Sequence, residues 1–161
     1  MSLDNFVMDL KRRKNPRLKD FDYSVPHAYF ITICSKEKKE IFTNDELNSK
    51  VISCLLSERK KNGFKIFAYC LMKNHIHIIM MPPGNGKTIS EFIGAFKSIS
   101  YAMLKKSGIK YSVWQERFYD HIIRRDEDFE DIVKYVLNNP VRKGIVQRWE
   151  DYKYCSLVDS W

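Results

Sequence analysis

Two histidines stand two residues apart in the segment 72–81, which reads MKNHIHIIMM. Side chains alternate between the two faces of an extended strand, so His75 and His77 should point to the same side. Ile76 and Ile78 should point to the other side and anchor the strand in a hydrophobic core. Paired imidazoles on one face can bind a divalent metal, although half-buried polar residues of an ordinary sheet give the same pattern.

A tyrosine and an asparagine stand four residues apart on a predicted helix. Asp126 is a suitable N-cap, and the helix should end at Pro140 because the residue before a proline disfavours helical geometry. Tyr135 and Asn139 would then lie one above the other on one flank of the helix. A partly buried aromatic residue and a C-terminal cap would produce the same pair. The residues expected to face inward are Phe129, Ile132, Val133 and Val136.

If the histidine strand is central and this helix packs beside it, His75, His77, Asn139 and Tyr135 converge on one site. Two neutral imidazoles and an amide oxygen would hold Mg²⁺ or Mn²⁺ and leave positions open for water or phosphate oxygens. A tyrosine hydroxyl one turn from a metal ligand could attack phosphorus and form a covalent phosphotyrosine. The new ester resembles the one broken, so the reaction would be reversible and suited to rejoining strands.

Hydrophobic periodicity predicts the elements that would position these residues. Capping-box spacings at Thr43/Glu46 and Thr88/Glu91 begin two amphipathic helices, which should end near Gly63 and Gly108. The predicted strands cover 29–34, 65–71, the histidine segment and 119–123. Strand, helix, strand, strand, helix, strand, helix is the order of an α+β ferredoxin-like sandwich. It would have a central antiparallel sheet, helices on one face and an appended nucleophile-bearing helix.

Composition favours a single domain that binds a polyanion. The chain has 161 residues, 44% of them hydrophobic, and its 28 Lys and Arg exceed its 20 Asp and Glu to give a net charge of +8. A merely basic, soluble protein is the alternative.

No apolar run is long enough to span a bilayer, and the N-terminus lacks a secretory signal. The cysteines show no close pairing, which favours a reducing compartment, so we expect a cytoplasmic, nucleoid-associated protein without a membrane partner. They are Cys34, Cys54, Cys70 and Cys155.

Basic residues outside the predicted core are candidates for contact with DNA phosphates. We expect residues 1–161 to form one domain, with 1–25 as a basic N-terminal arm and 145–161 as an aromatic-rich C-terminal tail. The arm carries the run KRRKNPRLK, whose ordinary role is that of a solvated tail. The candidate DNA-binding residues are Lys11, Arg12, Arg13, Lys14, Arg17, Arg124, Arg125, Arg142 and Lys143.

Three segments together resemble a known family. They are HIH at 75–77, WQERFYDHIIRRDEDFEDIVKYVLNNPVRKG at 114–144, and RLKDFDYSVPHAYFITIC at 17–34. This combination is similar to the single-tyrosine HUH transposases, in particular the branch of REP-associated tyrosine transposases. The resemblance implies that His75 and His77 bind the metal, that Tyr135 is the nucleophile and that Asn139 is the third ligand. Relatives in the wider group often have glutamine at that third position, and Lys73 replaces the usual proline before the Asn-His pair.

The resemblance also implies an activity. Members of this family cut single-stranded DNA at or near hairpin-forming sequences, become joined to the 5′ phosphate and leave a free 3′ hydroxyl. We therefore expect a metal-dependent endonuclease and strand transferase that uses Mg²⁺ or Mn²⁺, acts on single-stranded or hairpin DNA, and is a monomer or homodimer. The alternatives are a non-catalytic single-stranded nucleic-acid-binding module on the same fold, and a phosphoesterase with two histidine motifs. The second is weakened because only one His-x-His occurs.

Tyr119 is the rival nucleophile, because it lies in FYDHIIR close to His121. The residue four positions beyond it is Ile123, which cannot bind a metal, so a structural or base-stacking role is expected instead. His121 is expected to be a buried core histidine. His27 has no evident partner in the sequence.

Overall fold

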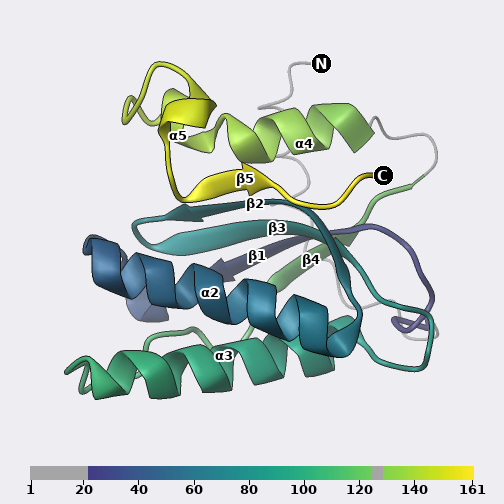
Figure 1. The fold of residues 1–161 in the computed structure, drawn as a ribbon, viewed down its shortest axis with the longest axis horizontal. Helices are drawn as coiled ribbons and strands as arrows, with labels where there is room; N and C mark the ends of the chain where they lie inside the picture. Colours follow the sequence, from purple (N-terminus) through teal and green to yellow (C-terminus); the bar gives the residue numbers. More distant parts are fainter. Residues whose placement is uncertain (1–21, 125–128) are drawn as a thin grey trace.

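A five-stranded antiparallel sheet forms the centre of the computed structural model, which describes residues 22–124 and 129–161. The order across the sheet is β4-β1-β3-β2-β5. The first four strands have the pairing of a ferredoxin-like sandwich, as predicted, and the fifth extends the sheet beyond β2 (Figure 1). Their bounds are β1 Tyr29–Cys34, β2 Lys65–Met72, β3 His75–Met81, β4 Tyr119–Ile122 and β5 Cys155–Leu157.

The histidine strand β3 is the central strand of this sheet. It pairs antiparallel with β1 on one side and with β2 on the other. A two-residue turn, Lys73 and Asn74, joins β2 to β3, as the sequence predicts. In the register of the sheet, Thr32 lies opposite His77, and Cys34 lies opposite His75. Residues of β1 therefore lie beside both histidines.

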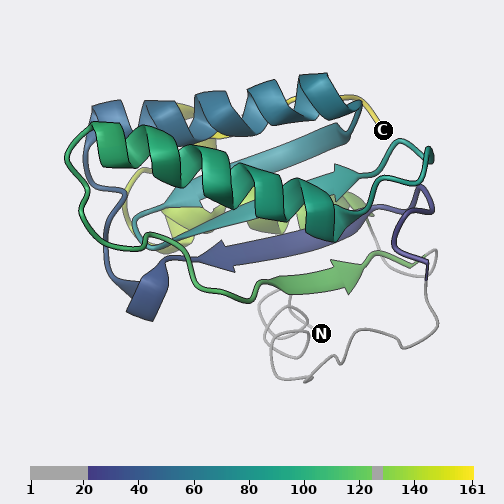
Figure 2. The same cartoon turned by 90° about the horizontal axis from the view of Figure 1, so that it is seen from below.

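Helices α2 (Asp45–Asn62) and α3 (Ile89–Lys106) pack together on one face of the sheet (Figure 2). They bury the side chains of β3 that point away from the histidines, including Ile76 and Ile78. The capping box of Thr88 and Glu91 is present at the start of α3, as predicted. A short 3-10 helix, η1 (Lys36–Lys38), lies between β1 and α2.

The predicted cap of α2 is wrong by one residue. Asn44, and not Thr43, caps this helix, and its Oδ1 accepts hydrogen bonds from the backbone N–H groups of Glu46 and Leu47. The helix ends at Gly63, as predicted, whose φ of 74° is readily accessible to glycine.

Helix α4 (Phe129–Leu137) covers the opposite face of the sheet (Figure 1). Its Ile132 and Val136 are buried against β2 and β3, in a second core that includes Phe30 and Ile79. The predicted cap of this helix, Asp126, lies outside the described residues.

Pro140 does not end helical structure as simply as predicted. After α4 ends at Leu137, a short helix α5 (Asn139–Arg142) begins and takes Pro140 into its first turn. Proline is tolerated there because a first-turn N–H needs no helical partner.

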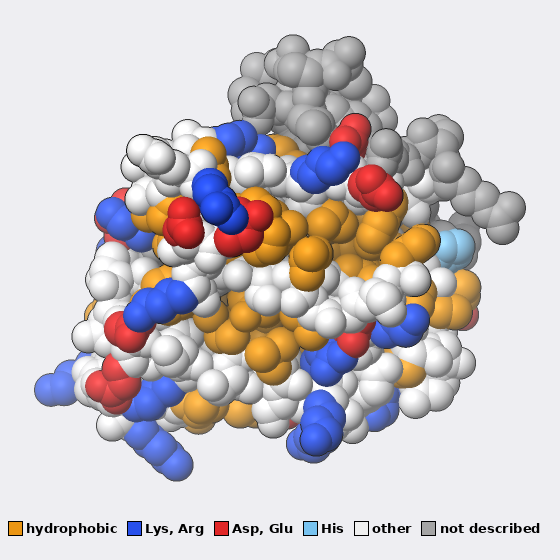
Figure 3. Space-filling view, turned by 45° about the horizontal axis from the view of Figure 1, so that its top comes forward, with side chains coloured by type: hydrophobic (Ala, Val, Ile, Leu, Met, Phe, Trp, Pro, Cys, Tyr) orange, Lys and Arg blue, Asp and Glu red, His pale blue; other side chains and the backbone are white. Residues whose placement is uncertain are grey.

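The C-terminal segment is more ordered than an aromatic tail. After the 3-10 helix η2 (Trp149–Asp151), it forms β5, which the sequence analysis does not predict. Asp159 then accepts hydrogen bonds from Arg59 of α2 and from the backbone N–H of Ile66. The last residue, Trp161, stacks on Phe129 at the start of α4, with ring centroids 4.1 Å apart. Hydrophobic side chains gather on the face of the molecule where α4 and the C-terminal segment lie (Figure 3).

None of the four cysteines forms a disulfide, and three of them are buried. Within the described part of the chain, no helix has the length and apolar character needed to cross a membrane.

Candidate active site

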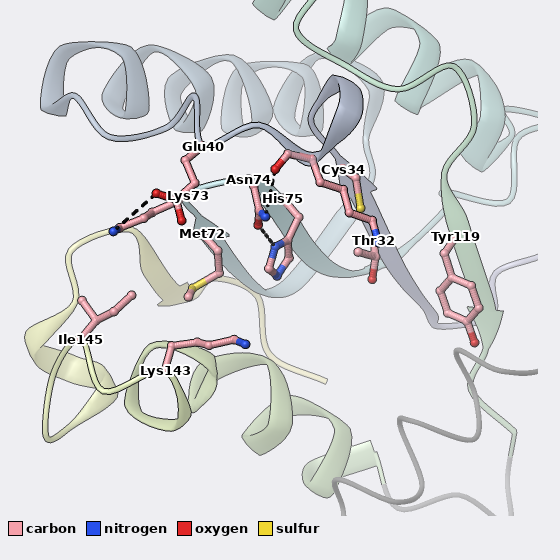
Figure 4. A pocket seen from close by; sticks show the side chains of 11 residues that line it. Thr32, Cys34, Glu40, Met72, Lys73, Asn74, His75, Tyr119, Lys143 and Ile145 are labelled. Carbon is pink, nitrogen blue, oxygen red and sulfur yellow. Dashed lines mark hydrogen bonds and ion pairs between the residues drawn. The ribbon is translucent and has the colours of Figure 1, made fainter.

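A pocket of about 640 Å³ opens at the face of strand β3 that carries the histidine side chains (Figure 4). His75 points into it from β3, and Lys143 extends toward it from the region after α5. Positively charged groups and sulfur-containing side chains surround the imidazole. The lining residues are Thr32, Cys34, Lys38, Glu40, Met72, Lys73, Asn74, His75, Tyr119, Lys143 and Ile145.

The two imidazoles lie side by side, as the alternation of a strand requires. Their ring centroids are 4.6 Å apart and their planes are inclined by 70°. His77 is fully buried, whereas His75 is half-buried at the pocket wall. The predicted pairing on one face is therefore present.

Each histidine is oriented through its Nδ1 atom. Nδ1 of His77 lies 2.8 Å from the hydroxyl oxygen of Thr32, and Nδ1 of His75 lies 2.7 Å from Oδ1 of Asn74. Asn74 Oδ1 can only accept, so a neutral His75 carries its proton on Nδ1 and has its lone pair on Nε2. The same tautomer of His77 would donate to Thr32. Metal-binding histidines commonly have their second nitrogen fixed in this way.

Tyr135 lies against the buried histidine. Its ring centroid is 6.1 Å from that of His77 and 6.2 Å from that of Phe30, which meets it edge-on. The guanidinium carbon of Arg142 lies 3.7 Å from the centroid of the tyrosine ring. The side chain is only 7% exposed. The predicted packing of the Tyr135 helix beside the histidine strand is thus observed.

Asn139 is buried one turn beyond Tyr135, with 3% exposure. The turn between α4 and α5 stays nearly helical, since the backbone N–H of Arg142 donates to the carbonyl of Asn138 and that of Lys143 to the carbonyl of Asn139. Nδ2 of Asn139 has no hydrogen-bond partner among the described residues. Nδ2 is a hydrogen-bond donor and cannot bind a cation, so Oδ1 is the atom of this amide that could bind a metal.

The donor set fits a hard divalent ion with an open coordination shell. No group of three His, Cys, Asp or Glu side chains among the described residues could hold a metal. Within this part of the chain, a third protein ligand would therefore have to be of another type, such as the amide of Asn139. Two imidazoles, an amide oxygen and solvent suit Mn²⁺ and Mg²⁺ better than a soft metal.

Several charged residues surround the pocket. Lys73 pairs with Glu40 at 3.8 Å, which partly neutralises both. Within the described residues, Lys38 and Lys143 form no ion pair, and both are exposed. The pocket therefore offers two ammonium groups to an anion near His75.

Among the remaining predicted DNA-binding residues, the structure describes Arg124 and Arg142. Arg124 and Arg142 are exposed, and Arg142 covers the Tyr135 ring as described above. The predicted contacts at Lys11, Arg12, Arg13, Lys14, Arg17 and Arg125 fall outside the described residues. Tyr119 lines the pocket from edge strand β4, and His121 is buried, as expected. His27 is exposed.

Sequence reasoning missed Thr32, Asn74 and Lys38. Asn74 precedes His75 directly, so its proximity was available as a signal. Thr32 could be found only from the register of β1 against β3, which involves residues 45 positions apart.

Comparisons with known proteins give consistent matches. The family model described as "Transposase IS200 like" matches residues 24–139. A Haemophilus influenzae protein assigned to the REP-associated tyrosine transposases is 27% identical over 146 residues, covering 84% of this chain and 82% of the relative. The REP-associated tyrosine transposase of Escherichia coli is 28% identical over 104 residues, covering 64% of this chain and 60% of the relative. A solved structure of a REP-associated tyrosine transposase bound to a REP hairpin has a TM-score of 0.70 and 21% identity, covering 88% of this chain and 82% of that one.

Proposed function

Because the chain belongs to the IS200-like transposase family, we propose that it cleaves and rejoins single-stranded DNA at hairpin-forming sequences through a 5′-phosphotyrosine intermediate. The family resemblance predicted from the sequence motifs is confirmed, and with it the assignment as a transposase, an enzyme that acts on DNA. The observation that carries the chemical proposal is the packing of the Tyr135 ring against His77, one helical turn from the buried Asn139.

Tyr135 is the proposed nucleophile. Its phenolic oxygen attacks the scissile phosphorus, the bond to the 3′ bridging oxygen breaks, and the proton lost by the phenol is balanced by one gained at the departing 3′ hydroxyl. Rejoining is the reverse reaction, in which a 3′ hydroxyl attacks the phosphotyrosine and releases the phenol. A phenol with an ordinary pKa of about 10 is a weak nucleophile at neutral pH, so precise placement and nearby positive charge must contribute.

His75, His77 and Asn139 are the proposed ligands of a divalent ion, Mg²⁺ or Mn²⁺. Such an ion, when bound, polarises a phosphoryl oxygen and stabilises charge as the bonds change. Asn74 contributes by favouring the tautomer of His75 whose Nε2 carries the lone pair, and Thr32 contributes by holding the ring of His77 in place. Burial of His77 keeps bulk water away from one side of the site.

The proposed substrate is single-stranded DNA next to a hairpin. This inference uses the relative whose structure is described as bound to a REP hairpin, together with the net charge of +8. Lys143 would contact a backbone phosphate in the pocket, and Arg124 and Arg142 would contribute from its surroundings. Such binding should weaken steeply with salt, because phosphate contacts release condensed counterions.

The test is a covalent trapping assay. End-labelled DNA hairpins with single-stranded extensions, drawn from a randomised pool, are incubated with the protein and Mn²⁺, and adducts are separated under denaturing conditions. The wild type and Tyr119→Phe should form an adduct, whereas Tyr135→Phe should not. An adduct that persists in Tyr135→Phe contradicts the assignment of the nucleophile.

The same assay separates this proposal from a non-catalytic binding module. The binding module is the better description if two results are obtained. His75→Ala and His77→Ala would bind the hairpin pool as tightly as the wild type, and neither the wild type nor these variants would form a covalent adduct with Mg²⁺ or Mn²⁺. Selective loss of adduct formation in the two histidine variants supports the transposase chemistry.

A further inference from the structure

We propose that the segment 35–42 binds the DNA backbone at a phosphate neighbouring the scissile one, through the side chain of Lys38. This inference rests on the proposed function, because it assigns a second phosphate subsite to the same pocket. The segment connects β1 to α2 and contains the 3-10 helix η1. No motif in the sequence marks it as a binding element.

The backbone of this segment has an unusual conformation. Glu37 and Lys38 have φ angles of 57° and 54°, in the left-handed region, and they are the two non-glycine residues with positive φ among the described residues. Such angles are unfavourable for side chains of this size. Consecutive residues of this kind persist only where surrounding contacts impose them, and they are frequent at ligand-binding sites.

Hydrogen bonds from both ends of the segment impose this conformation. The backbone N–H of Ser35 donates to the carbonyl of Asn74 at 2.9 Å, and that of Phe42 donates to the carbonyl of Lys73 at 2.9 Å. Between them, the hydroxyl of Ser35 donates to the carbonyl of Lys39 at 2.6 Å. The segment is therefore fixed to the β2–β3 turn, immediately before His75.

Lys38 connects this segment to the histidine through its backbone. Nδ2 of Asn74 donates to the carbonyl of Lys38 at 3.3 Å. Oδ1 of the same amide lies 2.7 Å from Nδ1 of His75 (Figure 4). One asparagine thus contacts both residues. The position of the Lys38 backbone and the orientation of the His75 ring are consequently linked.

The charges of the pocket favour an anionic ligand at Lys38. Its side chain lines the same pocket as His75 and Lys143. Glu40 also lines this pocket, but it pairs with Lys73 at 3.8 Å, so the excess positive charge rests on Lys38 and Lys143. With the scissile phosphate at the histidines, an ammonium group elsewhere on the pocket wall is suited to the next phosphodiester of the same strand.

The test compares Lys38→Ala with Lys36→Ala, both in a Tyr135→Phe background so that binding is measured without cleavage. Lys36 belongs to the same 3-10 helix and is exposed, but its side chain does not line the pocket. The probe is a DNA hairpin with an oligothymidine extension, and its affinity is measured by fluorescence anisotropy over a series of salt concentrations. Lys38→Ala should weaken binding about three- to fivefold and reduce the slope of log affinity against log salt by about 0.7.

The second part of the test locates the contact. On a hairpin whose cleavage position has been mapped with the wild type, each phosphate flanking the scissile one is replaced singly by an uncharged methylphosphonate. One replacement should weaken binding of the Tyr135→Phe protein and have no further effect once Lys38 is also alanine. Inorganic phosphate at millimolar concentration should not compete, since the subsite takes a phosphodiester held by its strand.

The proposal is overturned if Lys38→Ala and Lys36→Ala lower the salt slope equally, or if every flanking methylphosphonate weakens both backgrounds by the same factor. The salt comparison needs no cleavage. If the wild type forms no adduct at all, the proposed function fails, while the salt slopes still decide whether Lys38 contacts a phosphate.

Discussion

Thr32→Val should affect both the stability of the protein and its affinity for metal. Valine has nearly the shape of threonine but lacks the hydroxyl that lies 2.8 Å from Nδ1 of His77. His77 is fully buried, so water cannot easily replace this contact. Leaving a buried polar group without its hydrogen bond costs about 1 to 3 kcal/mol. For a chain of this length, each kcal/mol lowers the melting temperature by about 2–4 °C, so we expect a decrease of about 2–12 °C.

The metal affinity should decrease as well, because the imidazole of His77 loses the partner that holds its ring in place. Removing such an outer partner lowers metal affinity by about 10- to 100-fold in known sites. The measurement is a titration with Mn²⁺ followed by electron paramagnetic resonance, beside thermal unfolding without metal.

Two matched variants complete the experiment. Thr32→Ser keeps the hydroxyl and should retain most of the metal affinity. Asn74→Ala removes the equivalent partner of the half-buried His75, where water can take its place, so it should weaken metal binding with little change in melting temperature. The reasoning is refuted if Thr32→Val unfolds within about 1 °C of the wild type and binds Mn²⁺ equally well.

Three further predictions concern other contacts of the fold and the site. Arg142→Ala removes the guanidinium that covers the Tyr135 ring. Loss of a cation–π contact worth about 0.5–1 kcal/mol should slow adduct formation at saturating DNA by roughly two- to fivefold. An unchanged rate would contradict this role of Arg142. The hydrogen bond from Arg59 lowers the pKa of Asp159, so this carboxylate stabilises the fold above its unfolded pKa of about 3.9 and loses that effect as the pH falls below it. The difference in melting temperature between the wild type and Asp159→Asn should therefore be largest at neutral pH and shrink below about pH 4, whereas a difference that is constant from pH 7 to 2 would exclude this cause. Thr88→Ala deletes the N-cap of α3 and should lower the free energy of unfolding by about 1 kcal/mol in urea denaturation; a variant as stable as the wild type would show that the cap is dispensable.

Local rules were sufficient for the parts of the site that lie within single elements. The alternation of a strand places His75 and His77 on one face, and the helical period places Tyr135 above Asn139. Cap chemistry identified Thr88 but chose Thr43 where Asn44 is the cap. Threonine and asparagine are both good N-caps, so adjacent candidates cannot be separated by residue type alone.

Long-range pairing was not available from local patterns. Thr32 is one polar residue in a hydrophobic strand, and its contact with His77 exists only because β1 and β3 pair in one register. Strand β5 has three residues and shows no clear alternation, so its pairing with β2 depends on the sheet already being formed. The strained backbone at Lys38 likewise results from hydrogen bonds made by residues distant in sequence.

The placement of Tyr135, the proposed nucleophile, depends on the C-terminal segment as much as on the sheet. Trp161 stacks on Phe129 at the first residue of α4, and Sγ of Cys155 lies 3.5 Å from the carbonyl oxygen of Leu137 at its last. Both ends of the helix that carries Tyr135 are therefore in contact with residues 155–161. Helix α4 has only nine residues, and a small rotation of it would move the tyrosine ring away from His77. The packing of Ile132 and Val136 alone restrains such a rotation less than additional contacts at both ends of the helix do. The segment that reads as a tail in the sequence is thus part of what holds Tyr135 beside the histidines.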